Sequence, residues 1–191
     1  MSGSGGVVGV DEAGRGALAG PILVVAIELM QPVEGLADSK LLCPKRRDQL
    51  FNEILRSARM GVAVICPKTI LRLNVLYATL HGMKKAILKL GVDAQHDIII
   101  DGNKTPTMAG LQIRAIPKAD ALVPEVSAAS IMAKVLRDRL MTKYHRIYDK
   151  YGFDQHKGYG TQIHYDALFE FGPSPIHRQG FNLNRQGTLF G

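Results

Sequence analysis

The chain has 191 residues, of which 46% are hydrophobic and 21% charged, a size and composition that fit one domain with a sizeable core. Its formal charge of +7 and its pI of about 9.5 favour a polyanionic partner, most commonly nucleic acid. No apolar run approaches the roughly 20 residues of a membrane span, and the two cysteines, Cys43 and Cys66, form no zinc pattern and suit reduced thiols of a cytoplasmic protein.

The first half of the chain is predicted to begin with strands and continue with helices. Residues 1–6 are expected to form a flexible leader. Apolar runs bounded by turn residues predict three strands, at residues 7–10, 22–29 and 61–66. The spacing of apolar residues predicts two helices, at residues 45–59 and 69–90. Pro44 suits the first turn of one helix, and Gly91 suits the end of the other.

The second half alternates strands and helices. Two further strands are predicted, at residues 97–100 and 111–116. Two further helices are predicted, at residues 124–144 and 161–169. Three β elements early in the chain, followed by alternating α and β elements, indicate an α/β domain built around a mixed sheet.

The most informative segment reads Val-Asp-Glu-Ala-Gly-Arg-Gly, at residues 10–16. Two adjacent carboxylates stand where an apolar run ends, and a glycine-arginine-glycine turn follows at once. Carboxylates bind divalent metal ions, and a guanidinium beside free backbone amides can hold a phosphate. An isolated Asp-Glu pair is usually only solvated, so the flanking turn is what indicates phosphodiester chemistry.

Chain-distant carboxylates are expected to meet at one edge of the sheet. Asp11 and Asp101 each follow a predicted strand, Asp120 precedes a predicted helix, and α/β sites lie where such ends meet. Taken singly, Asp101 is typical of a turn and Asp120 of a helix start. Glu12 can join Asp11 only if the strand has ended or bulged, because neighbouring strand residues face opposite ways.

Such a cluster needs a cation or a proton. Two like charges 4 Å apart repel by roughly 4 kcal/mol at an effective dielectric near 20. Oxygen ligands favour Mg²⁺ or Mn²⁺ over zinc. A pair of such ions, roughly 3.5–4 Å apart, can activate water and stabilise the leaving oxygen of a phosphodiester.

The ordered set of motifs closely resembles the ribonuclease HII family. The match covers about residues 7–181 and includes residues 10–16, 36–40, 100–103, 118–120, 127–138, 156–161 and 174–178. The resemblance implies a single RNase H-like domain with a mixed central sheet flanked by helices. It also implies a helical C-terminal extension at about residues 143–181, followed by a tail at residues 182–191.

The resemblance implies an endonuclease that cleaves RNA paired with DNA. It implies nicking 5′ of single ribonucleotides embedded in duplex DNA, with 3′-hydroxyl and 5′-phosphate products. Carried over by motif, the acidic cluster that binds Mn²⁺ or Mg²⁺ consists of Asp11, Glu12, Asp101 and Asp120. The substrate contacts carried over in the same way are Gly14, Arg15, Gly16, Ser39, Lys40 and Tyr159. The first three match a turn that reads the ribose 2′-hydroxyl, and Tyr159 matches a ring that stacks on the next deoxyribose.

Other polar residues leave alternatives open. Four cations are either phosphate contacts or a solvated helix face: Lys134, Arg137, Arg139 and Lys157. Three histidines fit no standard zinc spacing and are interpreted as polar packing or phosphate contacts: His156, His164 and His177. Without the family, Tyr159 would be read as a loop aromatic that caps the core.

The C-terminal residues resemble a short motif with which DNA enzymes bind a sliding clamp. The motif is carried by Gln186, Leu189 and Phe190, and a frayed tail is the alternative. We expect a monomer. Two other functions remain to be distinguished, a DNA resolvase or integrase of the same fold and a nucleic-acid-binding module without catalysis. The Gly-Arg-Gly turn and Tyr159 fit ribose sensing and argue against the resolvase or integrase, whereas the binding module would show no metal-dependent cleavage.

Overall fold

A five-stranded mixed sheet forms the centre of the molecule. The computed structural model describes residues 5–36, 42–181 and 183. The strands are β1 (Val7–Ala13), β2 (Ile22–Leu29), β3 (Ala58–Ile65), β4 (Asp97–Asp101) and β5 (Gln112–Ile116). They lie in the order β3-β2-β1-β4-β5, with β1 antiparallel to β2 and parallel to β4. The expected mixed sheet is therefore confirmed, and β1 is its central strand.

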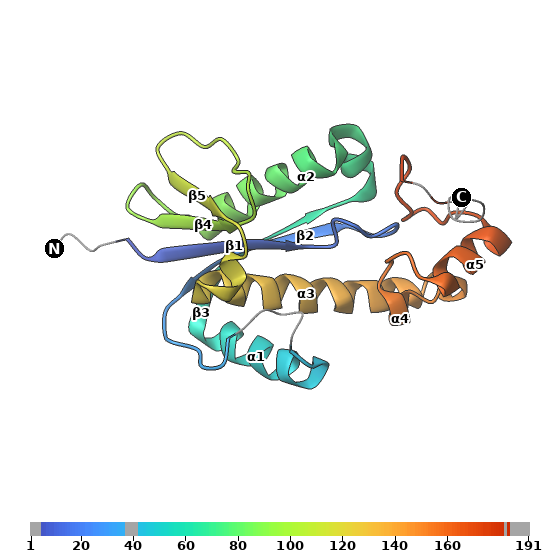
Figure 1. Cartoon of the computed structure of the whole chain (residues 1–191), viewed down its shortest axis with the longest axis horizontal. Helices are drawn as coiled ribbons and strands as arrows, with labels where there is room; N and C mark the ends of the chain where they lie inside the picture. Colours follow the sequence, from blue (N-terminus) through green and yellow to red (C-terminus); the bar gives the residue numbers. More distant parts are fainter. Residues whose placement is uncertain (1–4, 37–41, 182, 184–191) are drawn as a thin grey trace, which may run out of the picture.

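Helices cover both faces of this sheet. The main helices are α1 (Pro44–Ser57), α2 (Pro67–Leu90), α3 (Pro124–His145), α4 (Phe153–His156) and α5 (Gln162–Phe171). Two single-turn 3₁₀ helices, η1 (Ala119–Ala121) and η2 (Asp149–Tyr151), precede α3 and α4. Figure 1 shows α2 on one side of the sheet and α3, with α1 beyond it, on the other. No helix in the described ranges combines the length and apolarity needed to cross a bilayer.

The alternation of side chains along the strands assigns each residue to one of two cores. Val8, Val10 and Ile100 pack with α2 residues such as Ile87. The opposite face, which includes Val25, packs with α1 and α3. Because successive strand residues point to opposite faces, Asp11 and its cross-strand partner Val25 belong to the α3 face.

A glycine in the central strand fixes the distance between the sheet and α3. A Cβ atom at Gly9 would lie 2.1 Å from the backbone carbon of Glu125 and 2.2 Å from the backbone nitrogen of Val126. Only a residue without a side chain allows this backbone approach. The first turn of α3 is thereby held against β1, two residues from Asp11.

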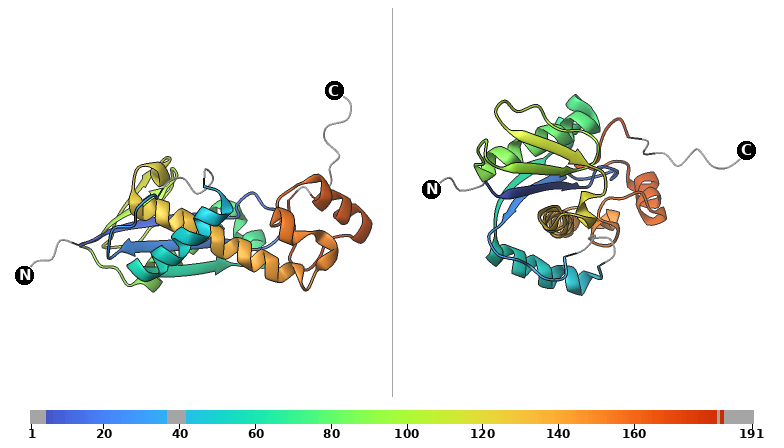
Figure 2. Two further views of the ribbon diagram at one scale, coloured as in Figure 1. Left: turned by 90° about the horizontal axis from the view of Figure 1, so that it is seen from below. Right: turned by 60° about the vertical axis from the view of Figure 1, so that its left-hand side comes forward.

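The chain beyond α3 forms a small helical unit at one end of the molecule. Figure 2 shows α4 and α5 projecting beyond the sheet, at the C-terminal end of α3. Their own cluster of buried side chains includes Phe153, Tyr151 and Ile176, with Met141 of α3 and Ala19 of the β1–β2 loop. The expected helical extension is present, and it is packed against the loop that follows the acidic motif.

Most predicted elements are found, with shifted boundaries. The first strand runs to Ala13, three residues beyond the predicted end. Helix α2 is interrupted at Asn74, where φ is 60° and ψ is 171°, and the Asn74 side chain accepts a hydrogen bond from the Tyr77 N–H at 3.2 Å. That contact begins the second part of the helix in the manner of an N-cap.

Candidate active site

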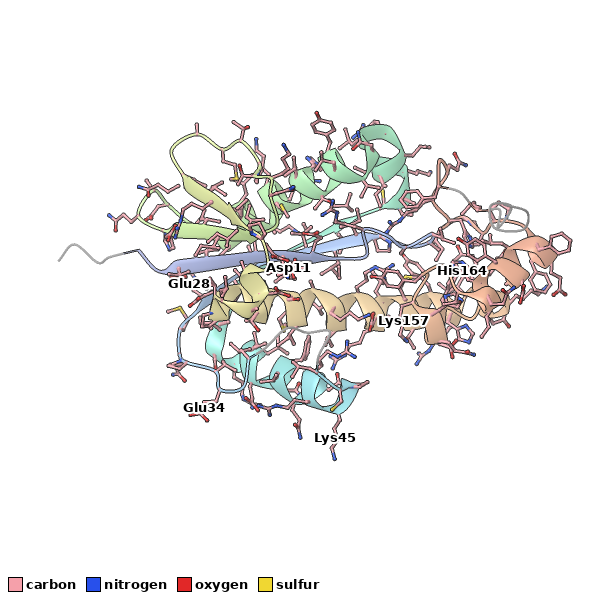
Figure 3. The ribbon with its side chains drawn as sticks, viewed as in Figure 1. Asp11, Glu28, Glu34, Lys45, Lys157 and His164 are labelled. Carbon is pink, nitrogen blue, oxygen red and sulfur yellow. The ribbon has the colours of Figure 1, made fainter. Side chains whose placement is uncertain are left out.

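The Asp11 carboxylate lies between the central strand and α3. Its side chain is 7% exposed. One carboxylate oxygen accepts a hydrogen bond from the Glu12 N–H at 2.7 Å, and Ser130 of α3 supplies a side-chain hydrogen bond. Figure 3 shows Asp11 between the β1 ribbon and α3. The carboxylate is therefore held in place by the strand and by the helix packed on it.

Burial and neighbouring charges destabilise the ionised form of Asp11. Removal from water raises the pKa of this carboxyl well above its usual value, and the negative charges of Glu12 and Asp101 raise it further. The hydrogen bonds from Ser130 and the Glu12 N–H act in the opposite direction. A group in this position gains from a cation placed beside it.

Asp101 and Asp120 are brought to the same end of the sheet by η1. Asp101 ends β4, the strand beside β1, and its carboxylate accepts a hydrogen bond from the Ala119 N–H at 2.9 Å. Asp120, 5% exposed, is the next residue of that 3₁₀ turn. Ile99 packs with Ala119 and Val126, which places Asp101, two residues further, on the α3 face with Asp11.

Glu12 does not meet the condition under which the sequence predicts that it joins Asp11. The expectation was that the strand ends or bulges before this residue, but β1 pairs regularly with β2 through Glu12 and Ala13. Glu12 therefore leaves the strand on the face opposite Asp11. The pairing of β1 with β4 extends from Val7 to Val10, so Glu12 lies beyond the part of β1 that pairs with β4. Its carboxylate lies 3.3 Å from the Arg15 guanidinium and still acts on Asp11 through its charge.

The oxygen donors of this cluster suit a hard divalent cation. Carboxylates are the preferred ligands of Mg²⁺ and Mn²⁺, and a cation beside Asp11 would offset the burial and the repulsion from Glu12 and Asp101 that raise its pKa. In the described part of the chain, however, no three carboxylate, imidazole or thiol side chains are already arranged as a set of metal ligands. The carboxylates lie near one another, but they do not yet form a coordination sphere around a single ion position.

The Gly-Arg-Gly turn is organised by a buried arginine from the far end of the chain. Arg178 is 0% exposed. It donates to the carbonyl oxygens of Gly14 at 2.6 Å, Arg15 at 2.8 Å and Gly20 at 2.9 Å. No carboxylate pairs with it among the described ion pairs. Burial lowers the pKa of Arg178 to about 9, so the guanidinium remains charged at neutral pH.

A second buried arginine supports the same loop from α3. Arg137, also 0% exposed, donates to the carbonyl oxygens of Pro21 at 3.0 Å, Ala19 at 3.2 Å and Lys157 at 3.0 Å. A Cβ atom at Gly14 would lie 2.0 Å from its Nε. The sequence suggested a phosphate contact or a solvated position for Arg137; both are wrong, because its donors are used inside the protein.

Tyr159 lies next to this loop. The Arg137 guanidinium carbon is 5.1 Å from the centre of the Tyr159 ring, and the Lys134 ammonium is 5.7 Å from it. The carbonyl of the preceding Gly158 accepts hydrogen bonds from Leu18 at 2.8 Å and Ala19 at 3.2 Å. Two predicted substrate contacts far apart in sequence, the turn and the tyrosine, therefore lie in one neighbourhood.

A basic groove begins at Tyr159 and runs between α1 and α3. Its volume is about 760 Å³. Six of its lining side chains are cationic and two are acidic. The cations are Arg47, Lys134, Arg139, Lys143, Arg146 and Lys157. Two of them are paired, Lys134 with Asp138 and Arg139 with Asp48, each at 2.9 Å. The excess of positive charge favours a phosphate backbone.

Two other predicted contacts, Ser39 and Lys40, lie outside the described residues. Sequence reasoning missed the organising role of Arg178, because nothing in the spacing of a C-terminal arginine indicates that it binds a loop at residues 14–20. The three histidines are found in the extension as polar packing, which was one of the two interpretations offered for them.

Comparisons with known proteins identify the family of the chain and agree with its fold. The family model described as ribonuclease HII matches residues 8–184. The chain is 45% identical to the ribonuclease HII of Polaromonas sp. strain JS666 over 178 residues, covering 92% of this chain and 88% of that protein.

Solved structures of other proteins share the fold. The ribonuclease H2 of Pyrococcus horikoshii OT3 superposes with a TM-score of 0.76 at 30% identity, covering 94% of this chain and 95% of that one. The ribonuclease HII of Archaeoglobus fulgidus, solved in complex with PCNA, has a TM-score of 0.80 at 24% identity, covering 96% and 98%. With a mixed sheet, gathered carboxylates and this match over nearly its whole length, the chain belongs to the ribonuclease HII family and is a hydrolytic endoribonuclease of the RNase H type.

Proposed function

We propose that the enzyme cleaves the RNA strand of RNA–DNA hybrids and nicks 5′ of single ribonucleotides embedded in duplex DNA, leaving 3′-hydroxyl and 5′-phosphate ends. In this proposal Asp11, Glu12, Asp101 and Asp120 hold two divalent ions, Mn²⁺ or Mg²⁺. The observation that supports it most is the juxtaposition of a buried carboxylate cluster with a glycine turn, joined by the contact between Arg15 and Glu12.

The four carboxylates reach the proposed metal site from different parts of the fold. Asp11 and Asp101 lie on the same face of adjacent strands, so they suit a shared ion; Asp120 approaches from η1, and Glu12 from the part of β1 beyond its pairing with β4. Bound ions would activate water and stabilise the leaving oxygen of the scissile phosphodiester. Helix α3 and η1 keep these carboxylates at low solvent exposure, where their charges act strongly.

The turn supplies the ribose specificity in this proposal. Arg15 and Gly16 are exposed, whereas Gly14 is buried beneath them. A Cβ atom at Gly16 would meet nothing within 4 Å, which leaves open space for a sugar. The carbonyls of Gly14 and Arg15 already accept from Arg178, so the turn keeps its shape when a 2′-hydroxyl, which is both donor and acceptor, is presented to it.

Tyr159 supplies the requirement for DNA after the ribonucleotide. Its ring is partly exposed at the mouth of the basic groove. A ring pressed on a deoxyribose would be crowded by an added 2′-hydroxyl, so a ribose would be rejected at this position. Ser39 and Lys40, outside the described residues, are proposed as phosphate contacts.

The proposed partner is a nucleic-acid duplex that runs from the carboxylate cluster past Tyr159 along the basic groove. We propose that residues 1–191 act as one catalytic domain and as a monomer. The clamp motif of Gln186, Leu189 and Phe190 lies outside the described residues. We propose that it binds a sliding clamp, in which case deletion of residues 186–191 abolishes clamp binding and leaves turnover of naked substrate unchanged.

The decisive experiment is a nick-mapping assay. Duplex DNA containing one ribonucleotide, a uniform RNA–DNA hybrid and an all-DNA duplex are incubated with Mn²⁺, Mg²⁺ or EDTA. Cleavage 5′ of the single ribonucleotide, dependent on metal and absent on all-DNA, is expected. Tyr159→Ala should reduce junction cleavage more than duplex binding, whereas Tyr77→Ala, on the exposed side of α2, should change neither. Metal-independent cleavage would contradict the proposal, and cleavage of all-DNA branched junctions would favour a resolvase.

A further inference from the structure

Three histidines of the C-terminal extension form a buried cluster that the proposed reaction does not use. The rings of His156 and His164 stack with centroids 4.4 Å apart, and His164 and His177 approach through their Nε2 atoms at 2.9 Å. His164 is 0% exposed and His177 is 5% exposed. Phe153 packs its ring against all three.

The hydrogen-bond partners determine where each proton lies. His177 Nδ1 accepts from the Ser174 N–H at 2.8 Å, so the proton of His177 must be on Nε2. His164 Nδ1 lies 2.9 Å from the Tyr159 carbonyl oxygen, which can only accept, so the proton of His164 must be on Nδ1. His164 Nε2 is then the acceptor for His177 Nε2–H. The chain therefore runs in one direction, from Ser174 through both imidazoles to Tyr159.

This chain of hydrogen bonds requires both rings to be neutral. An extra proton on His164 would place two N–H groups against each other at the contact between the two Nε2 atoms. An extra proton on His177 would lie on Nδ1, against the Ser174 N–H. Burial lowers the pKa of His164 and of His177 to about 4. Both rings are consequently neutral near pH 7, in the single arrangement that their partners allow.

The same histidine cluster forms hydrogen bonds with the backbone of both Gly158 and Tyr159. His156 Nδ1 accepts from the Gly158 N–H at 3.1 Å, and His156 Nε2 lies 2.7 Å from the Tyr151 carbonyl oxygen. The Gly158 carbonyl faces the other way and binds the loop after the acidic motif. The backbone of Tyr159 is thus fixed between the histidines and the loop of residues 14–20.

We propose that His164, with its tautomer set by His177, is a positioning residue for Tyr159 in substrate recognition. This inference rests on the proposed function, because it assigns the tyrosine a sugar-contacting role. His164 never touches substrate. It holds the Tyr159 carbonyl, and so the ring attached to the same residue, at the angle from which the ring meets the deoxyribose after the ribonucleotide.

Two substitutions at one position separate this role from simple packing. The amide of asparagine reaches about as far as Nδ1 of histidine, and the amide of glutamine about as far as Nε2. His164→Asn therefore keeps a donor for the Tyr159 carbonyl and loses the bond to His177. His164→Gln keeps an acceptor for His177 and loses the bond to Tyr159. Both variants carry a neutral amide in the same buried site.

The readout is the ratio of kcat/KM on duplex DNA with one ribonucleotide to kcat/KM on a uniform RNA–DNA hybrid, with thermal unfolding measured alongside. We expect His164→Gln to lower this ratio about fivefold, the effect of one lost hydrogen bond, and His164→Asn to leave it within twofold of wild type. Equal losses in both variants, or losses that follow unfolding temperature alone, would overturn the inference.

The outcomes distinguish this inference from the function on which it rests. If the wild-type protein does not cleave at the junction, the proposed function fails. If wild type cleaves there and Tyr159→Ala lowers the ratio while His164→Gln does not, only the role of His164 fails. Imidazole ¹⁵N shifts give a test without substrate: a proton on Nε2 of His164 at pH 7, instead of Nδ1, contradicts the arrangement.

Discussion

At the scale of single residues, the site brings together carboxylates whose negative charges repel one another in the metal-free protein. Asp11 is buried beside two other carboxylates, and burial with their repulsion raises its pKa well above the usual value. The hydrogen bonds from Ser130 and Glu12 hold the carboxylate in position without removing the cost of its charge. Such an arrangement is unfavourable in the metal-free protein and becomes favourable when a cation is present.

Substitution of Asp11 by asparagine should therefore affect activity and stability in opposite directions. Asp11→Asn is expected to lower kcat by at least about 100-fold, because it removes a proposed metal ligand. In EDTA at pH 7 it should raise the unfolding temperature, because a neutral amide replaces a repelled, desolvated charge. Steady-state cleavage and thermal denaturation measure the two effects.

The matched control lies on the neighbouring strand. Asp97 is at the other end of β4 and pairs with the exposed Arg114 at 2.5 Å. Asp97→Asn should retain activity and change stability little, since exposed ion pairs contribute little. Full activity of Asp11→Asn, or of Asp101→Asn, would contradict the proposed metal role.

The sequence predicted the roles of carboxylates whose chemistry and place after a strand are local features. It did not predict the roles of residues that depend on partners far away in the chain. Asp11 and Asp101 each follow a predicted strand, so their proximity could be inferred from the order of elements. The face taken by Glu12 could not, because it depends on how far β1 continues. Arg137 and Arg178 carry no local pattern for burial, and their carbonyl partners are known only once the loop is folded.

At the scale of elements, the loop between β1 and β2 is the part most dependent on its surroundings. Gly14 has φ of 97°, in the left-handed region, and its missing side chain makes room for Arg137. The guanidiniums of Arg178 and Arg137 donate hydrogen bonds to carbonyl oxygens of the loop. The N–H groups of the loop donate to the carbonyl oxygens of Gly158 and Ile176. Its shape is thus set by α3 and the C-terminal extension.

Two glycines of the same turn should respond differently to alanine. Gly14→Ala forces a strained φ and a clash with Arg137, and we expect it to lower the free energy of unfolding by about 1–3 kcal/mol and to reduce cleavage. Gly16→Ala meets open space, so its stability should equal that of wild type while substrate affinity falls. Urea denaturation separates the two, and equal destabilisation would contradict this account of the turn.

The regular elements were predictable because their signals are local. Apolar runs and spacing located the five strands and four of the helices, with boundaries shifted by up to three residues. The first strand was predicted too short because the polar pair after Val10 resembles a strand end. The short turn η1 and the interruption at Asn74 depend on one or two hydrogen bonds each, and such features leave no periodic pattern.

At the scale of the whole molecule, two apolar layers build the sheet domain and a third cluster attaches the extension. Helix α3 belongs to both parts, since its first turns pack on β1 and its end, with Met141, joins the extension. The extension carries the buried imidazoles of His164 and His177. Its attachment therefore depends on imidazoles that remain neutral in the folded protein down to about pH 4, whereas histidines of an unfolded chain are protonated below about pH 6.5.

We expect the stability of the protein to fall as pH drops from 6.5 towards 4. In this window the unfolded chain, with histidine pKa values near 6.5, binds protons that the folded protein does not, since the pKa of His164 and of His177 is about 4. Each imidazole contributes a slope of about 1.4 kcal/mol per pH unit. Urea denaturation at several pH values between 5 and 7 measures it.

His164→Asn provides the comparison for this prediction. The variant has no imidazole at this position, so its stability should depend less steeply on pH over the same interval. Carboxylates contribute mainly below pH 5, so the interval from 5 to 6.5 reports on the histidines. An unchanged slope in the variant would show that His164 does not titrate as its burial requires.

The bonds from Arg178 to Gly14 and Arg15 join positions 164 and 163 residues apart in the chain. On the ribosome, all four acidic residues emerge long before the arginine that shapes the turn beside them. A chain that lacks Arg178 would carry the carboxylates beside a turn whose carbonyl oxygens have lost this guanidinium partner. The turn beside these carboxylates therefore takes its final shape only after Arg178 has been synthesised.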